Sequence, residues 1–305
     1  MKAVTLDNIK KTYNKGKTTA VSGVSFEVEQ GELFGLIGPD GAGKTSIFRI
    51  LTTLLLPDGG NANVTGFDVV KDYRKIREQL GYMPGRFSLY QDLTVEENLN
   101  FFATLFNTTI QENYALIEDI YVQIEPFKTR RAGKLSGGMK QKLALCCALI
   151  HKPTVLFLDE PTTGVDPVSR KEFWNMLKKL KQQGITILVS TPYMDEATLC
   201  DRIALIQTGH ILSVDTPENI TKGYSGNLYA VKAVSMYHAL KELRAYENTF
   251  SCYAFGEYLH LSLKDNFPNA IHEVTTYLQS KGQSEIEMKP IGANIEDCFI
   301  RLLKE

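Results

Sequence analysis

The chain has 305 residues, of which 43% are hydrophobic, so it can bury a substantial core and exceeds the usual length of one domain. Thirty-four basic and 35 acidic residues leave a formal net charge of −1, which supplies no overall field for nucleic acid, and we expect no nucleic-acid partner. Five cysteines without CxxC spacing exclude a disulfide framework and a structural zinc site, and they favour a reducing cytosol.

The N-terminal part predicts antiparallel strands followed by the opening of an α/β domain. Apolar and polar residues alternate over residues 3–13 and 20–32, as in half-buried strands. LFGLIG, residues 33–38, is a continuously apolar run typical of a buried central strand. KTSIFRILTTLLL, residues 44–56, follows with helical spacing. A strand, a glycine-rich turn and a helix in this order begin an α/β domain.

The middle of the chain predicts an inserted helical lobe, about residues 92–150, and then a βαβ unit. Two buried strands, TVLFLD and ITILVS, flank residues 168–184, whose apolar positions recur at helical spacing. The last of these residues, Gly184, suits a helix C-cap.

Residues 223–305 predict a separate small α+β domain, because the composition turns polar and glycine-bearing over 217–226. The expected order is strand, helix, hairpin, helix, strand and helix, over residues 228–234, 236–246, 249–263, 268–281, 285–290 and 295–303. Up to the last strand this is the split-βαβ order, βαββαβ. This part lacks a nucleophile, a metal cluster and a phosphate loop, so we expect a regulatory or dimer-stabilising role.

GPDGAGKT, residues 38–45, fits the P-loop pattern GxxxxGK[ST] between a predicted strand and a predicted helix. Glycines let backbone N–H groups surround a polyphosphate, Lys44 adds a cation and Thr45 offers a hydroxyl to Mg²⁺. The alternative is a glycine turn that only caps a helix. The expected ATP-binding residues here are Gly38, Pro39, Asp40, Gly41, Ala42, Gly43, Lys44, Thr45 and Ser46.

VLFLDE, residues 155–160, ends a predicted buried strand with two carboxylates. Such a strand normally exposes polar groups only at its functional end. We expect Asp159 to hold the metal through water and Glu160 to polarise the attacking water. The alternative, an acidic N-cap for the next helix, is disfavoured because PTTGVDP intervenes before that helix.

LSGGMKQ, residues 135–141, lies between these motifs. With the P-loop upstream and LFLDEPTTGVDP downstream, it resembles the signature of ATP-binding-cassette (ABC) ATPases over about residues 4–219. The resemblance implies a P-loop NTPase core of the α/β class with an antiparallel β subdomain and a helical lobe. It also implies that signature residues contact ATP held by the opposite subunit of a homodimer or heterodimer; the matching positions are Ser136, Gly137, Gly138 and Gln141.

Two further positions take their roles from the resemblance. Tyr13 matches the aromatic residue on which the family stacks adenine, although a strand tyrosine taken alone more often serves packing. Asp166 matches the D-loop, through which the two nucleotide sites communicate. Without the family, Ser136 would be interpreted as a helix N-cap.

Two positions depart from the family pattern. Gly85 stands where glutamine is usual, and Pro192 stands where the switch histidine is usual. Neither side chain can donate or accept a hydrogen bond. A charge-assisted hydrogen bond contributes about 1.5–3 kcal/mol, so loss of the histidine alone predicts hydrolysis slowed by roughly ten- to a few hundred-fold. ATP binding should suffer less, because the P-loop and metal residues are intact.

The P-loop, MDEA after the switch and the tail IGANIEDCFIRLLK resemble the ATPases of bacterial multidrug, antibiotic and lipid exporters. The membrane-spanning subunits of those systems are separate chains. We therefore expect ATP and Mg²⁺ as cofactors, an integral membrane permease as partner, and a cytoplasmic location on the inner face of the cell membrane. A permease groove is expected near residues 85–98, with Phe87, Leu89, Tyr90 and Leu93, although these residues can equally serve the chain's own core.

Two functions remain open from the sequence. The chain is an ATPase subunit of an exporter, or it is a weakly hydrolysing module that completes the active site of a partner ABC ATPase. Glu160 favours the first, whereas Gly85 and Pro192 favour the second.

Overall fold

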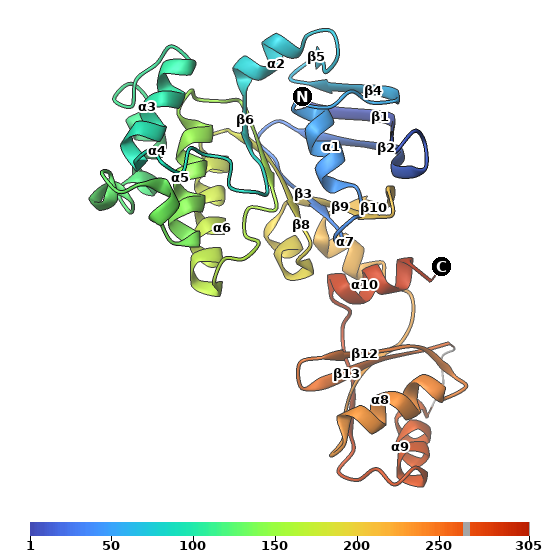
Figure 1. Ribbon diagram of the computed structural model, residues 1–305. Helices are drawn as coiled ribbons and strands as arrows, with labels where there is room; N and C mark the ends of the chain where they lie inside the picture. Colours follow the sequence, from blue (N-terminus) through green and yellow to red (C-terminus); the bar gives the residue numbers. More distant parts are fainter. Residues whose placement is uncertain (265–268, 305) are drawn as a thin grey trace. The chain divides into compact units, whose positions relative to one another are not determined.

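The structure is a computed structural model that describes residues 1–264 and 269–304. The chain forms two compact units, Met1–Pro217 and Glu218–Glu305 (Figure 1). The division falls before residue 222, so helix α7 (Pro217–Lys222) belongs mostly to the second unit. A contact within that unit accounts for this, because the Cys298 thiol donates to the Ile220 carbonyl at 3.5 Å.

The first sheet of the N-terminal unit is antiparallel, in the order β2-β1-β4-β5. The alternating segments form its two long strands, as expected. The strands are β1 (Lys2–Tyr13), β2 (Thr18–Glu29), β4 (Gly59–Val64) and β5 (Phe67–Asp68).

The second sheet is the core of this unit, in the order β10-β9-β3-β8-β7-β6. Its strands are β3 (Leu33–Ile37), β6 (Leu80–Met83), β7 (Val155–Asp159), β8 (Thr186–Thr191), β9 (Arg202–Gln207) and β10 (His210–Asp215). The strands from β6 to β9 run parallel, and every residue of β3, β7 and β8 is buried. Parallel strands present their carboxyl ends at one edge, where the polar residues that follow them gather.

Helix α1 (Lys44–Leu51) packs between the two sheets, and α2 (Tyr73–Gln79) lies near β5 and β6. The helix expected over residues 44–56 is too long. Thr53 has a left-handed φ of 63°, which ends the helix. Arg77 holds this turn, because its Nε donates to Thr53 Oγ1 at 2.8 Å and Nη2 donates to the Thr53 carbonyl at 3.0 Å.

The helical lobe contains α3 (Val95–Leu105), α4 (Tyr114–Tyr121) and α5 (Gly137–Leu149), with short 3₁₀ turns at Glu125–Phe127 and Ala132–Lys134 (green in Figure 1). A capping box between Thr94 and Glu97 fixes the start of α3. Helix α6 (Pro167–Gln182) follows β7, and Gly184 has a φ of 88° just beyond its end, as a C-cap glycine requires. A 3₁₀ segment, η3 (Met194–Leu199), follows β8.

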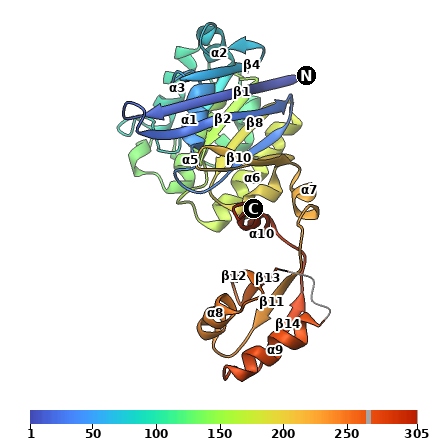
Figure 2. The same ribbon diagram turned by 90° about the vertical axis from the view of Figure 1, so that its right-hand side faces the viewer.

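The C-terminal unit has an antiparallel sheet in the order β12-β13-β11-β14, which is the split-βαβ arrangement. Helices α8 and α9 share the unit's apolar core with this sheet (Figure 2). Pro268, where a helix was expected to start, lies outside the described residues. The elements are β11 (Leu228–Lys232), α8 (Met236–Ala245), β12 (Thr249–Phe255), β13 (Tyr258–Leu263), α9 (Ala270–Ser280), β14 (Glu287–Pro290) and α10 (Ile295–Leu302).

The five cysteines are free and buried, and burial raises the pKa of every thiol. Within residues 1–264 and 269–304, no helix has both the length and the apolar character that a membrane span requires.

Candidate functional site

The P-loop connects the end of β3 to the start of α1, and its glycines are required by the backbone. Gly41 and Gly43 have φ values of 79° and 105°, which side chains rarely tolerate. A Cβ on Gly43 would lie 2.3 Å from the Ala20 carbonyl oxygen, and one on Gly38 would lie 2.2 Å from that of Ile206. The backbone of the turn therefore lies close to Ala20 and Ile206, whereas the space beside Gly41 is open.

Lys44 is the central cation of this turn, with only 3% of its surface exposed. Its Nζ donates to the carbonyls of Gly38 at 2.8 Å and Pro39 at 3.0 Å, and it lies 3.1 Å from Glu160 Oε1. Thr45 and Ser46 follow in the first turn of α1, where helical N–H groups lack backbone acceptors. The P-loop thus combines a fixed ammonium group with a helix N-terminus, which is the donor set that a polyphosphate requires.

The carboxyl end of β7 brings two acidic side chains to the same place. Asp159 is 2% exposed, and its Oδ1 accepts a hydrogen bond from Ser190 Oγ at 2.5 Å. Glu160 has a left-handed φ of 50°, and its N–H donates to both the carbonyl and the hydroxyl of Ser190 at 3.0 Å. A non-glycine residue in this region needs its surroundings to hold it, and Ser190 on β8 does so.

Tyr13 lies at the end of β1 and reaches the start of α1. Its hydroxyl is 3.1 Å from Ser46 Oγ, although the two residues are far apart in the sequence. The aromatic ring therefore lies beside the P-loop helix.

The signature residues lie at the start of α5, next to α6 and the loop before it. Ser136 is the N-cap, and its Oγ accepts from Met139 N at 3.4 Å. A Cβ on Gly138 would lie 2.9 Å from Ser169 Oγ, so the glycine allows the two helices to approach closely. Gly137 lies beside the Gly164 carbonyl, and Gln141 lies with Gly138 and Ser169 around one small hollow.

Asp166 is the N-cap of α6, with Oδ1 accepting from Ser169 N at 3.0 Å and Val168 N at 3.1 Å. Hydrogen bonds from Ser169 lower the pKa of Asp166. The D-loop and signature residues thus form one cluster around the N-termini of α5 and α6, whereas the P-loop, Asp159, Glu160 and Tyr13 form another.

The two divergent positions belong to the second of these clusters. A Cβ on Gly85 would lie 3.0 Å from the Asp159 carbonyl oxygen, so the loop after β6 packs tightly against the end of β7. Pro192 is half-buried directly after β8, whose last carbonyl, that of Thr191, accepts from Gly38 N at 3.2 Å. Gln91 lies in the helical lobe, where its carbonyl accepts from Gly133 N at 2.9 Å.

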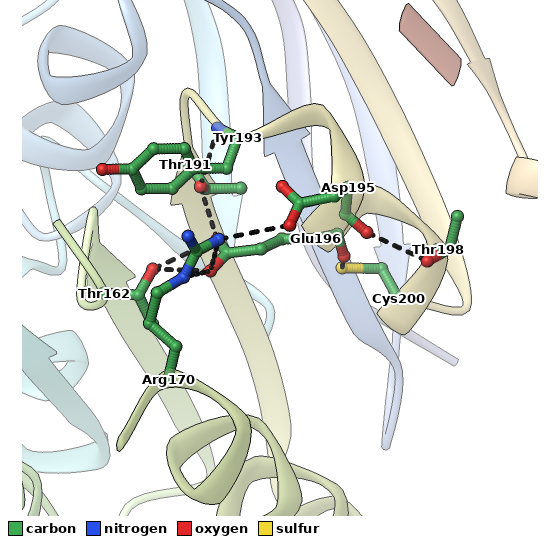
Figure 3. Close-up of polar contacts among 8 residues, drawn as sticks. All are labelled: Thr162, Arg170, Thr191, Tyr193, Asp195, Glu196, Thr198 and Cys200. Carbon is green, nitrogen blue, oxygen red and sulfur yellow. Dashed lines mark hydrogen bonds and ion pairs between the residues drawn. The ribbon is translucent and has the colours of Figure 1, made fainter. Parts of the chain in front are cut away.

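Sequence reasoning missed a polar network behind Pro192. Glu196 is 2% exposed and receives hydrogen bonds from Thr162, Thr191 and Arg170 (Figure 3). The signal that could have found part of it is a pair of hydroxyl residues, Ser190 and Thr191, at the end of a buried strand.

A cavity of about 1010 Å³ lies between β6 and the helical lobe. Its lining is largely apolar and includes Leu54, Leu89, Phe102, Leu105 and Phe106, with His151 among them. Of the other residues expected at this groove, Phe87 lies beside Lys140, and Tyr90 packs on Phe101.

The arrangement suits a magnesium nucleotide. The Thr45 hydroxyl belongs to the residue after Lys44, and Asp159 directly precedes Glu160, whose carboxylate contacts Lys44. Mg²⁺ typically takes one or two carboxylates together with phosphate oxygens. The described residues contain no cluster of three or more carboxylate, His or Cys side chains that would form an all-protein metal cage.

Comparison with known proteins agrees with this geometry. Residues 21–163 match the ABC transporter family. The chain is 35% identical over 302 residues to "Nod factor export ATP-binding protein I" of Burkholderia orbicola (strain AU 1054), covering 97% of this chain and 95% of that protein. The chain belongs to the ABC transporter ATP-binding proteins.

One further relative is about twice as long as this ABC protein, and one solved structure shares the fold of most of it. The "Probable multidrug ABC transporter ATP-binding protein YbhF" of Escherichia coli (strain K12) is 38% identical over 98% of the chain. The chain spans about half the length of that protein, 52%. The dimeric bacterial ABC transporter cassette MJ0796 has a TM-score of 0.63 and 25% identity, over 70% of this chain and 98% of the cassette. The predicted ABC ATPase fold is therefore confirmed.

Proposed function

We propose that this ABC protein binds and hydrolyses ATP and acts as the ATPase subunit of an exporter, driving a separate integral membrane permease. The observation that carries the proposal is the buried Lys44 ammonium group, held by P-loop carbonyls 3.1 Å from the Glu160 carboxylate. A phosphate-binding cation and a carboxylate that can polarise water thus lie side by side.

The binding residues follow from the P-loop geometry. The first N–H groups of α1 and the Lys44 ammonium group bind the phosphates, and Tyr13 stacks on the adenine. Thr45 and Asp159 hold Mg²⁺, with Asp159 acting through water. When bound, Mg²⁺ neutralises charge on the phosphate oxygens. Ser190 fixes the orientation of the Asp159 carboxylate through its short hydrogen bond.

Glu160 is the catalytic residue that orients and polarises the attacking water. Its partial exposure, 23% of the side chain, leaves the carboxylate open to water while its backbone is held by Ser190. Turnover is reduced, because Gly85 and Pro192 supply no side-chain donor at the reacting phosphate.

Two copies of the chain, or this chain and a relative, enclose two ATP molecules. The residues for the opposite site are Ser136, Gly137, Gly138 and Gln141, with Asp166 beside them at the start of α6. This proposal is supported by the position of the Ser136 N-cap at a helix N-terminus, which is favourable for an anion. A second support is that the structurally similar cassette MJ0796 forms a dimer.

The cavity beside β6 is the proposed docking site of the permease. Two leucines at this cavity, Leu54 and Leu105, are 58% and 59% exposed, so the hollow presents apolar surface to solvent, as interaction sites do. An apolar helix of a permease loop on the inner face of the membrane would cover them. This assignment places the chain peripherally at that face.

A second candidate function is favoured by Gly85 and Pro192 together. In it, the chain holds ATP with little turnover, and its signature completes the site of a more active partner chain.

The ATPase rate of the purified chain, compared with Glu160→Gln, tests the proposal. We expect slow hydrolysis by the wild type and a loss of roughly 10²–10⁴-fold in the variant, with ATP binding retained. Hydrolysis that is unaffected by Glu160→Gln contradicts the proposal, and a wild type that binds ATP without turnover supports the second candidate.

A further inference from the structure

Glu196 is a buried carboxylate that four donor groups from three residues surround (Figure 3). Thr162 Oγ1 donates to its two oxygens at 2.8 and 3.1 Å, and Thr191 Oγ1 donates at 2.5 Å. Arg170 contributes Nε at 3.1 Å and Nη2 at 3.0 Å. With 2% exposure, this carboxylate is isolated from water, and these partners supply the hydrogen bonds that water would otherwise make.

The donors come from three segments that the chain must bring together. Thr162 lies two positions after Glu160, Thr191 ends β8, and Arg170 lies in the first turns of α6 just after the Asp166 cap. A single side chain therefore ties the loop after β7 to the switch segment and to the D-loop helix.

Arg170 is itself held in place from the switch side. Its guanidinium carbon lies 4.2 Å from the centre of the Tyr193 ring, and Nη2 is 3.4 Å from Asp195 Oδ2. A guanidinium group that stacks on a ring and binds a carboxylate with two nitrogens has little freedom to move. These contacts immobilise Tyr193, the residue next to Pro192.

Glu160 needs this support because its backbone is unfavourable. Its φ of 50° is held on one side by Ser190, which accepts from the Glu160 N–H. On its C-terminal side, Glu160 is followed two residues later by Thr162, whose hydroxyl donates to Glu196. Resting on the proposed function, we infer that Glu196 and Arg170 are a positioning pair that fixes Glu160 for hydrolysis in a switch without a histidine.

The chain offers a matched control pair away from this site. Arg202 Nη1 lies 3.3 Å from Glu32 Oε1, Glu32 is 7% exposed, and the Arg202 guanidinium lies 5.7 Å from the centre of the Phe34 ring. Both pairs thus combine a buried glutamate with an arginine on an aromatic ring. A general loss of stability would follow from disrupting either pair, whereas displacement of Glu160 would follow from only one.

The test compares the full-length variants Glu196→Gln, Arg170→Met and Arg202→Met with the wild type. Hydrogen exchange is measured at the Glu160, Thr163 and Val165 amides, which donate to Ser190, Glu160 and Thr162. We expect Glu196→Gln and Arg170→Met to speed exchange at these amides by about tenfold or more. We expect them also to lower kcat by about tenfold or more at nearly constant KM for ATP. Arg202→Met should leave exchange at these amides and kcat unchanged.

Two further variants separate positioning from folding. Arg170→Lys keeps the charge and loses the two-pronged contact, so it provides a folded variant if Arg170→Met does not fold. The double change Arg170→Met with Glu196→Met removes the buried carboxylate together with its partly exposed arginine partner, and it should restore thermal stability without restoring kcat or amide protection.

The hydrogen-exchange data test the positioning role of Glu196 and Arg170 whether or not the wild type hydrolyses ATP. Unchanged exchange in the Glu196 and Arg170 variants overturns the inference, as does raised exchange with wild-type kcat in an active enzyme. An inactive wild type contradicts the proposed ATPase, while the exchange measurement still shows whether the pair holds the Glu160 loop.

Discussion

The Nζ of Lys44 lies 3.1 Å from Oε1 of Glu160, and both side chains sit at the carboxyl edge of the core sheet. The ammonium group already has two carbonyl acceptors in the P-loop, so the carboxylate is its third partner. Nucleotide phosphates would compete for the same ammonium group. Phosphate binding would thereby release Glu160 toward water, which would link substrate binding to the readiness of the residue that we propose as catalytic.

Pro192→His should raise the rate of ATP hydrolysis, because it restores a donor at the end of β8. The expected gain in kcat is roughly ten- to a few hundred-fold, which corresponds to one charge-assisted hydrogen bond. Steady-state ATPase assays of the two proteins measure it. An unchanged kcat would mean that the missing donor does not limit turnover.

Gly85→Gln should give no comparable gain, although it also restores the family residue. Its Cβ would lie 3.0 Å from the Asp159 carbonyl oxygen, so the loop must shift before the amide can reach the phosphate. We expect kcat to stay level or fall, and Gly85→Ala to behave similarly in the same assay. An increase in kcat equal to that of Pro192→His would contradict this expectation, because it would show that the loop after β6 can shift at little cost.

Gly138→Ala should destabilise the contact between α5 and α6, because the added Cβ would lie 2.9 Å from Ser169 Oγ. Overpacking of this kind costs about 1–3 kcal/mol, which should lower the denaturation midpoint in urea. Ser169→Ala in the same chain should recover part of the loss, because it removes the Oγ contact and leaves the contact with the Ser169 Cβ at 3.2 Å. A full loss that persists in the double variant would place the cause outside this contact.

Buried His151 should make the free energy of unfolding decrease as the pH falls below the ordinary pKa of histidine, 6.5. Its Nε2–H donates to the Leu80 carbonyl at 2.9 Å, the ring stacks on Phe106, and burial lowers its pKa. The unfolded chain therefore takes up a proton near pH 6.5 that the folded chain binds only at lower pH, so stability present above 6.5 is lost below it.

The variant His151→Phe isolates this effect. It costs stability at every pH through the lost hydrogen bond, but the difference from the wild type should shrink between pH 7 and pH 5. Urea denaturation at several pH values measures the difference. A difference that stays constant or grows at low pH contradicts the assignment.

The sequence predicts those parts of the site that are continuous along the chain. The P-loop from Gly38 to Thr45 follows one buried strand, and Asp159 ends another with Glu160 directly after it. The residues and the setting of each motif are therefore read from one continuous stretch. The ends of helices and strands are harder to predict from sequence. Helix α1, for example, ends at a left-handed turn at Thr53 that is fixed by Arg77, which lies in a different helix.

Contacts between distant segments were not predictable from local pattern. The support of Glu160 by Ser190 depends on the pairing of β7 with β8. The Glu196 network likewise joins Thr162, which follows β7, to Thr191, which ends β8. Gly138 shows the same limit. The resemblance to ABC ATPases gives it a role toward the opposite nucleotide, whereas the structure adds a close contact with Ser169 that only the packing of α5 on α6 reveals.

The most direct test of the central claim is calorimetric titration of the purified chain with magnesium ATP, repeated with Lys44→Ala. A control variant, Lys232→Ala, removes a lysine paired with Glu257 at 2.9 Å in the C-terminal unit. We predict saturable uptake by the wild type and the control, and affinity weakened by about tenfold or more in Lys44→Ala. Absence of uptake by the wild type, or equal affinity in Lys44→Ala, would contradict ATP binding at this P-loop.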